Sequence, residues 1–124
     1  MIDVSIVWVN PGRDVTYRTL APVHFATSLG SITVPAGFVT DFASIPQAAQ
    51  SFVGKERPAV VMSSLLHDYI YQMRGEVGLG SPLNREQADR LMLEIMEKVG
   101  GTSAVHRGVI YRAVRAFGGR AWKS

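Results

Sequence analysis

The stretch PAVVMSSLLHDYIYQM, residues 58–73, decides the fold, because it separates a strand-forming part of the chain from a helix-forming part. Pro58 suits the first turn of a helix, where a missing backbone N–H costs little. At about 100° per residue, seven apolar side chains share one continuous arc, which predicts an amphipathic helix over 58–73. They are Leu65, Tyr69, Met62, Met73, Leu66, Ala59 and Ile70.

The opposite side of this helix carries Ser64, His67, Asp68, Tyr71 and Gln72. Periodicity therefore places the His–Asp pair on a polar face, where exposed side chains need no special role. Tyr71 and two valines on the same side indicate that this face is partly covered. The stretch alone leaves open whether the pair is a working site or only the solvated edge of a helix.

A second helix is expected after the glycine-rich segment 74–84. Asn84 is a suitable N-cap, and Gln87 three residues later completes the spacing of a capping box. This helix is expected to end at Gly100-Gly101.

A third helix is expected to begin near Thr102 or Ser103 and to stop at Gly118-Gly119. Its predicted apolar stripe consists of Val105, Val109, Ile110, Ala113, Val114 and Phe117.

The first third of the chain is rich in β-branched and aromatic residues, which favour strands. The predicted strands are 4–10, 15–20, 23–27 and 31–37, the last two forming a hairpin around Ser28-Leu29-Gly30. Residues 37–47 join the strands to the helices, and Pro46 prevents helix from starting before about that point. The prediction is a small antiparallel sheet followed by about three helices, an α+β fold.

Length and composition fit one soluble domain, with strands and the sheet-exit loop in 1–46 and helices in 47–124. Apolar residues make up 47% of the 124 residues and charged residues 19%. The chain has no cysteine, which excludes disulfides, zinc–thiolate sites and thiol nucleophiles. The first ten residues do not resemble a signal peptide, and no apolar run is long enough to cross a bilayer.

The formal net charge of +3 hides a basic C-terminal run. From residue 106 onward there is no acidic residue, and such a run can contact nucleic acid or an anionic lipid surface. A solvated helix face is the ordinary explanation, because the run contains no recognisable nucleic-acid-binding motif. Its basic residues are Arg107, Arg112, Arg115, Arg120 and Lys123.

Asp89 breaks the pattern of the second helix. It falls inside the apolar arc, between Met96 and Leu93, although the opposite face already holds most of the charged residues. A carboxylate on the core side costs several kcal/mol unless it is paired or hydrogen-bonded. The candidate partners are Arg85, one turn earlier, and His67, if the two helices lie antiparallel.

A carboxylate that holds one imidazole nitrogen fixes the tautomer and leaves the other nitrogen to act as base or metal ligand. Asp68 points about 100° away from His67 and could bind a hard divalent cation such as calcium. The alternative is structural: a pair between Asp89 and His67 or Arg85 that only ties two helices together.

The segment TDFAS adds Thr40, Asp41 and Ser44 on the connection between sheet and helices. Asp and Ser often cap helices and turns, which is the ordinary explanation for them here. The functional alternative makes Asp41 a second carboxylate in the same cleft as Asp68. His24 and His106 are expected to be structural or exposed.

Three pieces in order, GFVTDFASIP, LLHDYIYQ and NREQADRLMLEIM, resemble a phage and prophage family called domain of unknown function 1353. Its pattern is T-D-x-A-S-x-P, H-D-x-x-Y and R-x-x-A-D, and YRAVRAFGGRAW is similar to its usual ending. The resemblance covers most of the chain and implies a phage or prophage origin, with a place in the host cytoplasm or the virion. It implies other phage proteins or a bacterial envelope component as partners, and no particular activity.

The piece LLHDYIY alone also resembles secreted phospholipases A2, which carry H-D-x-x-Y on one helix and a second Asp on an antiparallel helix. There the His activates water, the first Asp binds calcium and the second Asp orients the His. By position, these roles would fall to His67, Asp68 and Asp89, with Tyr71 as the motif tyrosine. This chain departs from that family in having no cysteines and no glycine-rich calcium loop before the helix.

Two functions follow from these observations. The first is a metal-assisted hydrolase acting on a bacterial envelope component, with His67, Asp89 and Tyr71 as the catalytic group and Asp68 and Asp41 holding the cation. Thr40, Ser44 and Arg85 would line the same site. The second is a non-enzymatic virion or assembly protein in which the same residues are structural.

Overall fold

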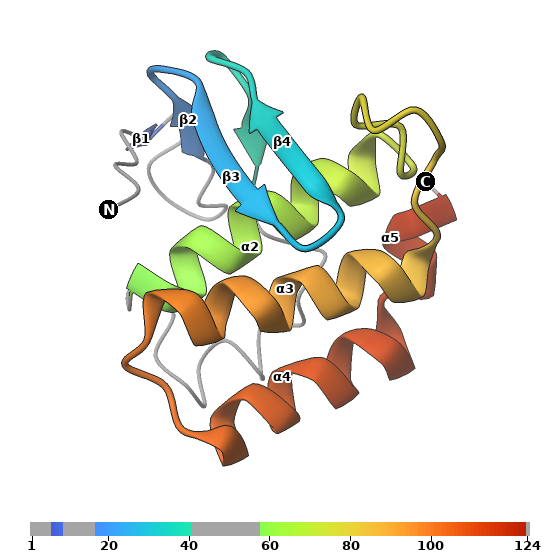
Figure 1. The fold of residues 1–124 in the computed structure, drawn as a ribbon. Helices are drawn as coiled ribbons and strands as arrows, with labels where there is room; N and C mark the ends of the chain where they lie inside the picture. Colours follow the sequence, from blue (N-terminus) through green and yellow to red (C-terminus); the bar gives the residue numbers. More distant parts are fainter. Residues whose placement is uncertain (1–5, 9–16, 41–57, 124) are drawn as a thin grey trace.

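The computed structural model describes residues 6–8, 17–40 and 58–123, with strands in the first part and helices in the second (Figure 1). This confirms the α+β class. The strands are β1 (Ile6–Trp8), β2 (Tyr17–Thr19), β3 (Val23–Thr27), β4 (Gly30–Val34) and β5 (Val39–Thr40). The helices are α2 (Pro58–Gln72), α3 (Arg85–Val99), α4 (Ala104–Phe117) and α5 (Gly119–Lys123).

The strands form two antiparallel sheets, so the expectation of a single sheet is wrong. One sheet has the order β1-β2-β5, and the other is the β3–β4 hairpin, which was predicted. Pro22 precedes β3 and cannot donate a ladder hydrogen bond, which helps to separate β3 from β2. The short β5 lies in a segment that was predicted to be a connection, and it pairs with β2.

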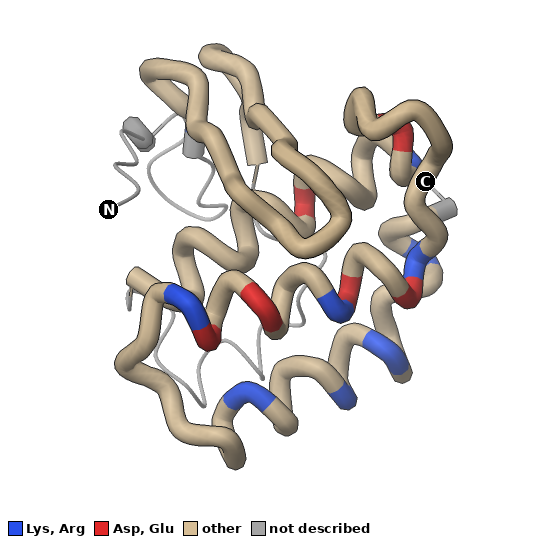
Figure 2. The backbone as a smooth tube through the Cα atoms, in the orientation of Figure 1, with Lys and Arg blue, Asp and Glu red and all other residues tan. Residues whose placement is uncertain are grey.

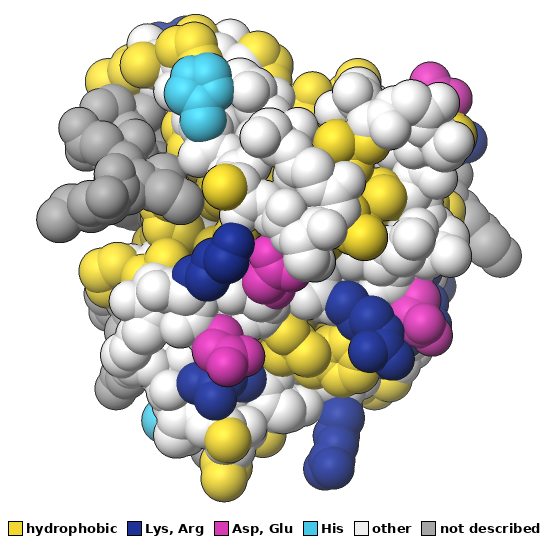
Figure 3. All heavy atoms as spheres, in the orientation of Figure 1, with side chains coloured by type: hydrophobic (Ala, Val, Ile, Leu, Met, Phe, Trp, Pro, Cys, Tyr) yellow, Lys and Arg dark blue, Asp and Glu magenta, His cyan; other side chains and the backbone are white. Residues whose placement is uncertain are grey.

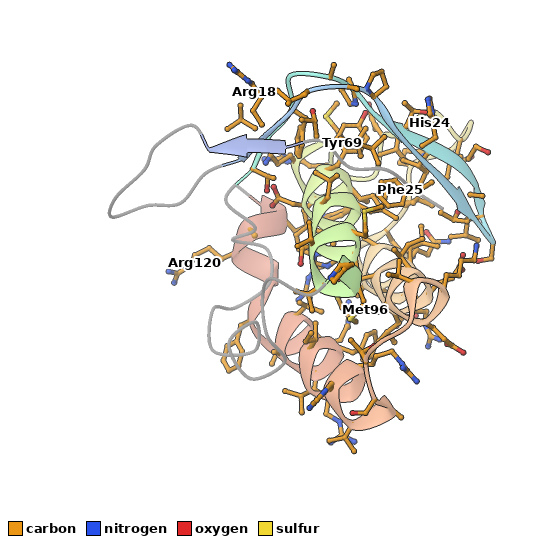
Figure 4. All side chains as sticks on the ribbon, turned by 90° about the vertical axis from the view of Figure 1, so that its left-hand side faces the viewer. Arg18, His24, Phe25, Tyr69, Met96 and Arg120 are labelled. Carbon is orange, nitrogen blue, oxygen red and sulfur yellow. The ribbon has the colours of Figure 1, made fainter. Side chains whose placement is uncertain are left out.

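The hairpin covers α2 and α3 with one apolar face (Figure 1). Its inward side chains are the cross-strand pairs Val23–Val34 and Phe25–Ile32, none of them more than 1% exposed. Figure 4 shows Phe25 directed toward the helices and its neighbour His24 directed outward. The strict two-residue alternation of this strand therefore fixes which face of the hairpin is buried.

Helix α2 is buried on both sides, which corrects the expectation of an exposed polar face. His67 and Tyr71 are at most 1% exposed, and Asp68 is 5% exposed. The apolar arc packs against the hairpin and α3, while Ala59 and Val60 contact a second apolar cluster that includes residues of α4. Of the five residues on the predicted polar face, only Gln72 is exposed, because neighbouring elements cover the other four. Met73, expected in the apolar arc, lies beyond the helix end and is exposed.

The predicted capping box of α3 and the predicted start of α4 are confirmed. Asn84 Oδ1 accepts from the Gln87 backbone N–H at 2.8 Å, and Gln87 Oε1 accepts from the Asn84 N–H at 2.8 Å. Ser103 caps α4 by accepting from the backbone N–H of His106.

The apolar stripe of α4 is only partly as predicted. Ile110 and Val114 are fully buried, but Val105 and Phe117 are 69% and 74% exposed because they lie near the two ends of the helix. The chain also turns at Gly118 into the short helix α5, which was not predicted. None of the helices in the described ranges is long and apolar enough to span a membrane.

The segment between α2 and α3 turns at Gly75, which has a φ of 84°. Its N–H donates to Ile70 and its carbonyl accepts from Leu83, which ties the end of α2 to the start of α3. A Cβ at this position would overlap the Leu83 backbone, whereas at Gly78, which has the same φ, it would meet nothing within 4 Å.

We therefore expect Gly75→Ala to destabilise the protein much more than Gly78→Ala. Both substitutions place an L-residue at positive φ, at a cost of about 1–2 kcal/mol. Only Gly75→Ala adds a collision with main chain, which must displace the junction between the helices. Urea unfolding of the two variants would measure this difference, and equal losses would contradict the described turn.

Candidate functional site

The Asp89 carboxylate lies on the core side of α3, as its place in the apolar arc predicted. It is fully buried and faces α2 and α4. Three side chains donate hydrogen bonds to it. His67 Nε2 and Tyr71 Oη lie 2.6 Å from Oδ1, and Arg115 Nη1 lies 2.7 Å from Oδ2. These contacts supply the pairing that a buried carboxylate requires.

Two of the donors come from successive turns of α2. His67 and Tyr71 are four residues apart, so their side chains project from the same side of the helix and meet at one oxygen. Their ring centroids lie 4.2 Å apart. Contacts between His67 and Asp89 and between Tyr71 and Arg85 show that α2 and α3 run antiparallel, as expected.

The Asp89 carboxyl is ionised at neutral pH. Burial raises its pKa, but the hydrogen bonds from His67, Tyr71 and Arg115, together with the charge of His67, lower the pKa below the ordinary 3.8. An ionised carboxylate can only accept, so the His67 nitrogen facing it must carry the proton. The neutral imidazole in this position is therefore the Nε2–H tautomer, with its lone pair on Nδ1.

Tyr71 acts as a donor in this cluster. Burial, followed by the hydrogen bond to Asp89 and its charge, raises the pKa of the phenol far above its ordinary value, although Arg85 partly opposes this. The phenol therefore stays protonated, and its ring packs edge-on against Trp122 of α5 at 5.1 Å.

Arg85 does not pair with Asp89, so that alternative is wrong. Its Nε donates to Tyr71 Oη at 3.1 Å, and its Nη2 donates to the carbonyls of Val114 and Arg115 at 2.5 and 2.9 Å. The Val114 carbonyl also accepts from the backbone N–H of Gly118, and a guanidinium has enough donors to bind two carbonyls at once. Arg85 therefore ties the end of α4 to the tyrosine that holds Asp89.

Arg115 was missed as a site residue because it was grouped with the basic run at the C-terminus. The available signal was Asp89, since a buried carboxylate requires a donor or cation from some neighbouring element. The hydrogen bond to Asp89 raises the pKa of Arg115. Figure 2 shows that basic residues follow α4 with no acidic residue among them, so Asp89 is supplied by the neighbouring helix.

Asp68 takes part in a different contact. Its Oδ2 accepts from Thr40 Oγ1 and, at 2.8 Å, from Gln72 Nε2, which joins α2 to β5. Asp41 and Ser44 lie outside the described residues, so the predicted cation site is not tested. Within the described ranges, no group of three His, Asp or Glu side chains is arranged to hold a metal ion.

The other two histidines lie away from this cluster. His24 is on the exposed face of the hairpin, where its Nδ1 lies 2.8 Å from Thr33 Oγ1. His106 is in the first turns of α4. Figure 3 shows that the face of α3 and α4 seen there carries acidic and basic side chains interspersed with apolar ones.

Comparison with known proteins gives one finding. The model of a family described as protein of unknown function (DUF1353) matches residues 17–114. The chain belongs to this family. The matched range includes the cluster residues Thr40, His67, Asp68, Tyr71, Arg85 and Asp89. It ends at Val114, directly before Arg115. No curated protein and no solved structure matches significantly.

The contact between Arg115 and Asp89 predicts a pH-dependent loss of stability in Arg115→Met. Removing one partner of a fully buried pair costs about 3–5 kcal/mol, and the Arg115 side chain is 33% exposed, so we expect about 1–2 kcal/mol at pH 7. A lowered carboxyl pKa stabilises the fold above the ordinary Asp value, and this contribution disappears as the pH falls through the folded-state pKa. The penalty should therefore shrink below about pH 3.8.

Urea unfolding of Arg115→Met across this pH range measures the effect. Arg112→Met, on the exposed side of the same helix, is the matched control and should leave stability within about 0.5 kcal/mol of the wild type. An equal effect of both substitutions would show that Arg115 does not stabilise the buried carboxylate.

Proposed function

We propose that this protein is a hydrolase in which His67 is the general base and Asp89 orients it. The observation that carries the proposal is the 2.6 Å contact between His67 Nε2 and the buried Asp89 carboxylate. Such a contact fixes the ring and the tautomer, and it stabilises the imidazolium that forms when the base takes a proton.

The reaction that suits this arrangement is attack by water on an ester. His67 Nδ1 takes a proton from a water molecule, and the water oxygen forms a bond to the carbonyl carbon. The ester C–O bond then breaks, and the proton passes from the imidazolium to the departing alkoxide, giving an acid and an alcohol. Asp89 stays ionised throughout, because its pKa is lowered and its oxygens are held by three donors.

Tyr71 has a supporting role in this scheme. It was predicted to be catalytic, but its raised pKa makes it a poor proton source, and its hydroxyl is directed to Asp89. We assign it, together with Arg85 and Arg115, to holding the carboxylate in place. Changes at these positions should therefore affect activity through the orientation of His67.

The resemblances guide the choice of substrate. A phage or prophage origin favours a component of the bacterial envelope, and the H-D-x-x-Y layout resembles enzymes that cleave phospholipid esters. The arrangement on α2 and α3 supports this choice, since a His and a motif Tyr on one helix meet an Asp on an antiparallel helix. We propose the acyl ester of a bacterial phospholipid as the substrate class.

A divalent cation at Asp68 and Asp41 stays a prediction. The described residues supply Asp68 alone, and one of its oxygens already accepts two hydrogen bonds. We therefore assign no step of the reaction to a metal, and we propose calcium only as a component to vary in the assay.

A structural role is the second candidate, and one observation favours it. His67 and Asp89 are both fully buried, and their contacts join α2, α3 and α4. A cluster that only pins helices together would have the same features. In this alternative the protein is a non-enzymatic phage virion or assembly component.

His67→Gln separates the two candidates. A glutamine amide can still donate to Asp89 from roughly the Nε2 position but cannot act as a base, so we expect the fold to persist and hydrolysis to fall by about 100-fold or more. Release of fatty acid from phosphatidylglycerol vesicles, with calcium or with a chelator, is the measurement. His24→Gln, on the exposed face of the hairpin, is the control and should keep full activity.

The structural alternative predicts a different result. Wild-type protein would release no fatty acid under either condition, while Asp89→Asn would still lose stability because its donors lose their acceptor charge. That combination would contradict the hydrolase and support the assembly role.

A further inference from the structure

Ser64 has a buried hydroxyl with no partner. It lies on α2 one turn before His67, and its side chain is fully buried. Its Oγ makes no hydrogen bond to any part of the chain that the structure describes. Burying a hydroxyl without a partner costs free energy, so native structures rarely keep one unless a water or a ligand satisfies it.

The neighbouring residue shows that this state is not imposed by the helix. Ser63 is equally buried, and its Oγ donates to the carbonyl of Val60 at 3.2 Å. Serines in helices commonly turn back to such carbonyls. Ser64, with the same side chain on the same helix, does not do so. The helix backbone therefore does not satisfy the Ser64 hydroxyl.

The position of Ser64 on the helix shows which side chains lie beside its hydroxyl. At about 100° per residue, Ser64, His67, Asp68 and Tyr71 fall within one arc of roughly 100°, and Ser64 lies between His67 and Asp68 in angle. Residues three and four apart have Cβ atoms about 5–6 Å apart. The orphan hydroxyl is thus a neighbour of the proposed base and lies one turn toward the helix N-terminus.

A nucleophilic serine is the first explanation to consider, since the set Ser64, His67 and Asp89 has the residue types of a catalytic triad. A serine nucleophile is expected within hydrogen-bonding distance of its base. Ser64 Oγ makes no such contact with His67. A water molecule can bridge two such side chains, because buried waters typically bind polar groups that have no protein partner.

We propose that Ser64 is a positioning residue whose hydroxyl holds the water that His67 deprotonates. This inference rests on the proposed hydrolytic function and adds to it the residue that orients the attacking water. The hydroxyl can donate to or accept from water, and neither role requires a charge at this buried position.

Kinetics of Ser64→Ala, with Ser63→Ala as the matched control, test the proposal. In phosphatidylglycerol vesicle hydrolysis we expect Ser64→Ala to lower kcat about tenfold, the equivalent of one hydrogen bond, with KM nearly unchanged. Ser63→Ala should retain kcat, because the Ser63 hydroxyl bonds only within the helix. A merely structural Ser64 would leave kcat unchanged in both variants, which would overturn the proposal.

Two further readouts separate this inference from the hydrolase itself. A crystal structure of the wild type should show a water within hydrogen-bonding distance of Ser64 Oγ, and the Ser64→Ala structure should lack it. Absence of that water in the wild type, or an acyl group on Ser64 detected by mass spectrometry, would overturn the proposal. If His67→Gln abolishes hydrolysis but Ser64→Ala does not, only the role of Ser64 fails. If wild-type protein hydrolyses nothing, the hydrolase and the role of Ser64 fail together.

Discussion

The ionised carboxylate of Asp89 is the constraint on which the helical part of this protein depends. A buried charge of this kind is tolerated only when its neighbours supply donors in good geometry. Here α2 supplies His67 and Tyr71, and α4 supplies Arg115. Because each donor comes from a different turn or helix, satisfying one carboxylate fixes how α2, α3 and α4 lie relative to one another. Arg85 extends the network by binding both Tyr71 and the last turn of α4.

The same requirement produces the chemistry that we propose. A carboxylate that must accept hydrogen bonds forces the proton of a neutral His67 onto Nε2 and the lone pair onto Nδ1. Tyr71 and Arg115 also donate hydrogen bonds to the carboxylate. Both have raised pKa values and stay protonated at neutral pH, so neither can replace His67 as a base. Stability and function are thus coupled at Asp89, so variants that keep its donors are the informative ones.

Much of this arrangement could be predicted from local rules. Helical periodicity placed Asp89 on the core side of its helix, which made Arg85 and His67 the candidate partners, and His67 is the one that contacts it. The capping box at Asn84 and the β3–β4 hairpin also follow from short-range signals, and both are confirmed. Features that depend on a second layer were not predictable in this way. The burial of the polar side of α2 and the contact of Arg115 with Asp89 depend on where α4 packs. The strand β5 has only two residues, which is too short for a recognisable strand pattern.

The protonation pattern of His67 tests the central claim most directly. Nitrogen-15 NMR of the imidazole, recorded at a pH high enough for the ring to be neutral, distinguishes a proton on Nε2 from one on Nδ1. We predict the Nε2–H form in the wild type, because Nε2 faces an ionised carboxylate at 2.6 Å. A neutral ring with its proton on Nδ1 would mean that Asp89 does not accept from His67, and it would contradict both the structural role of the carboxylate and the proposed base.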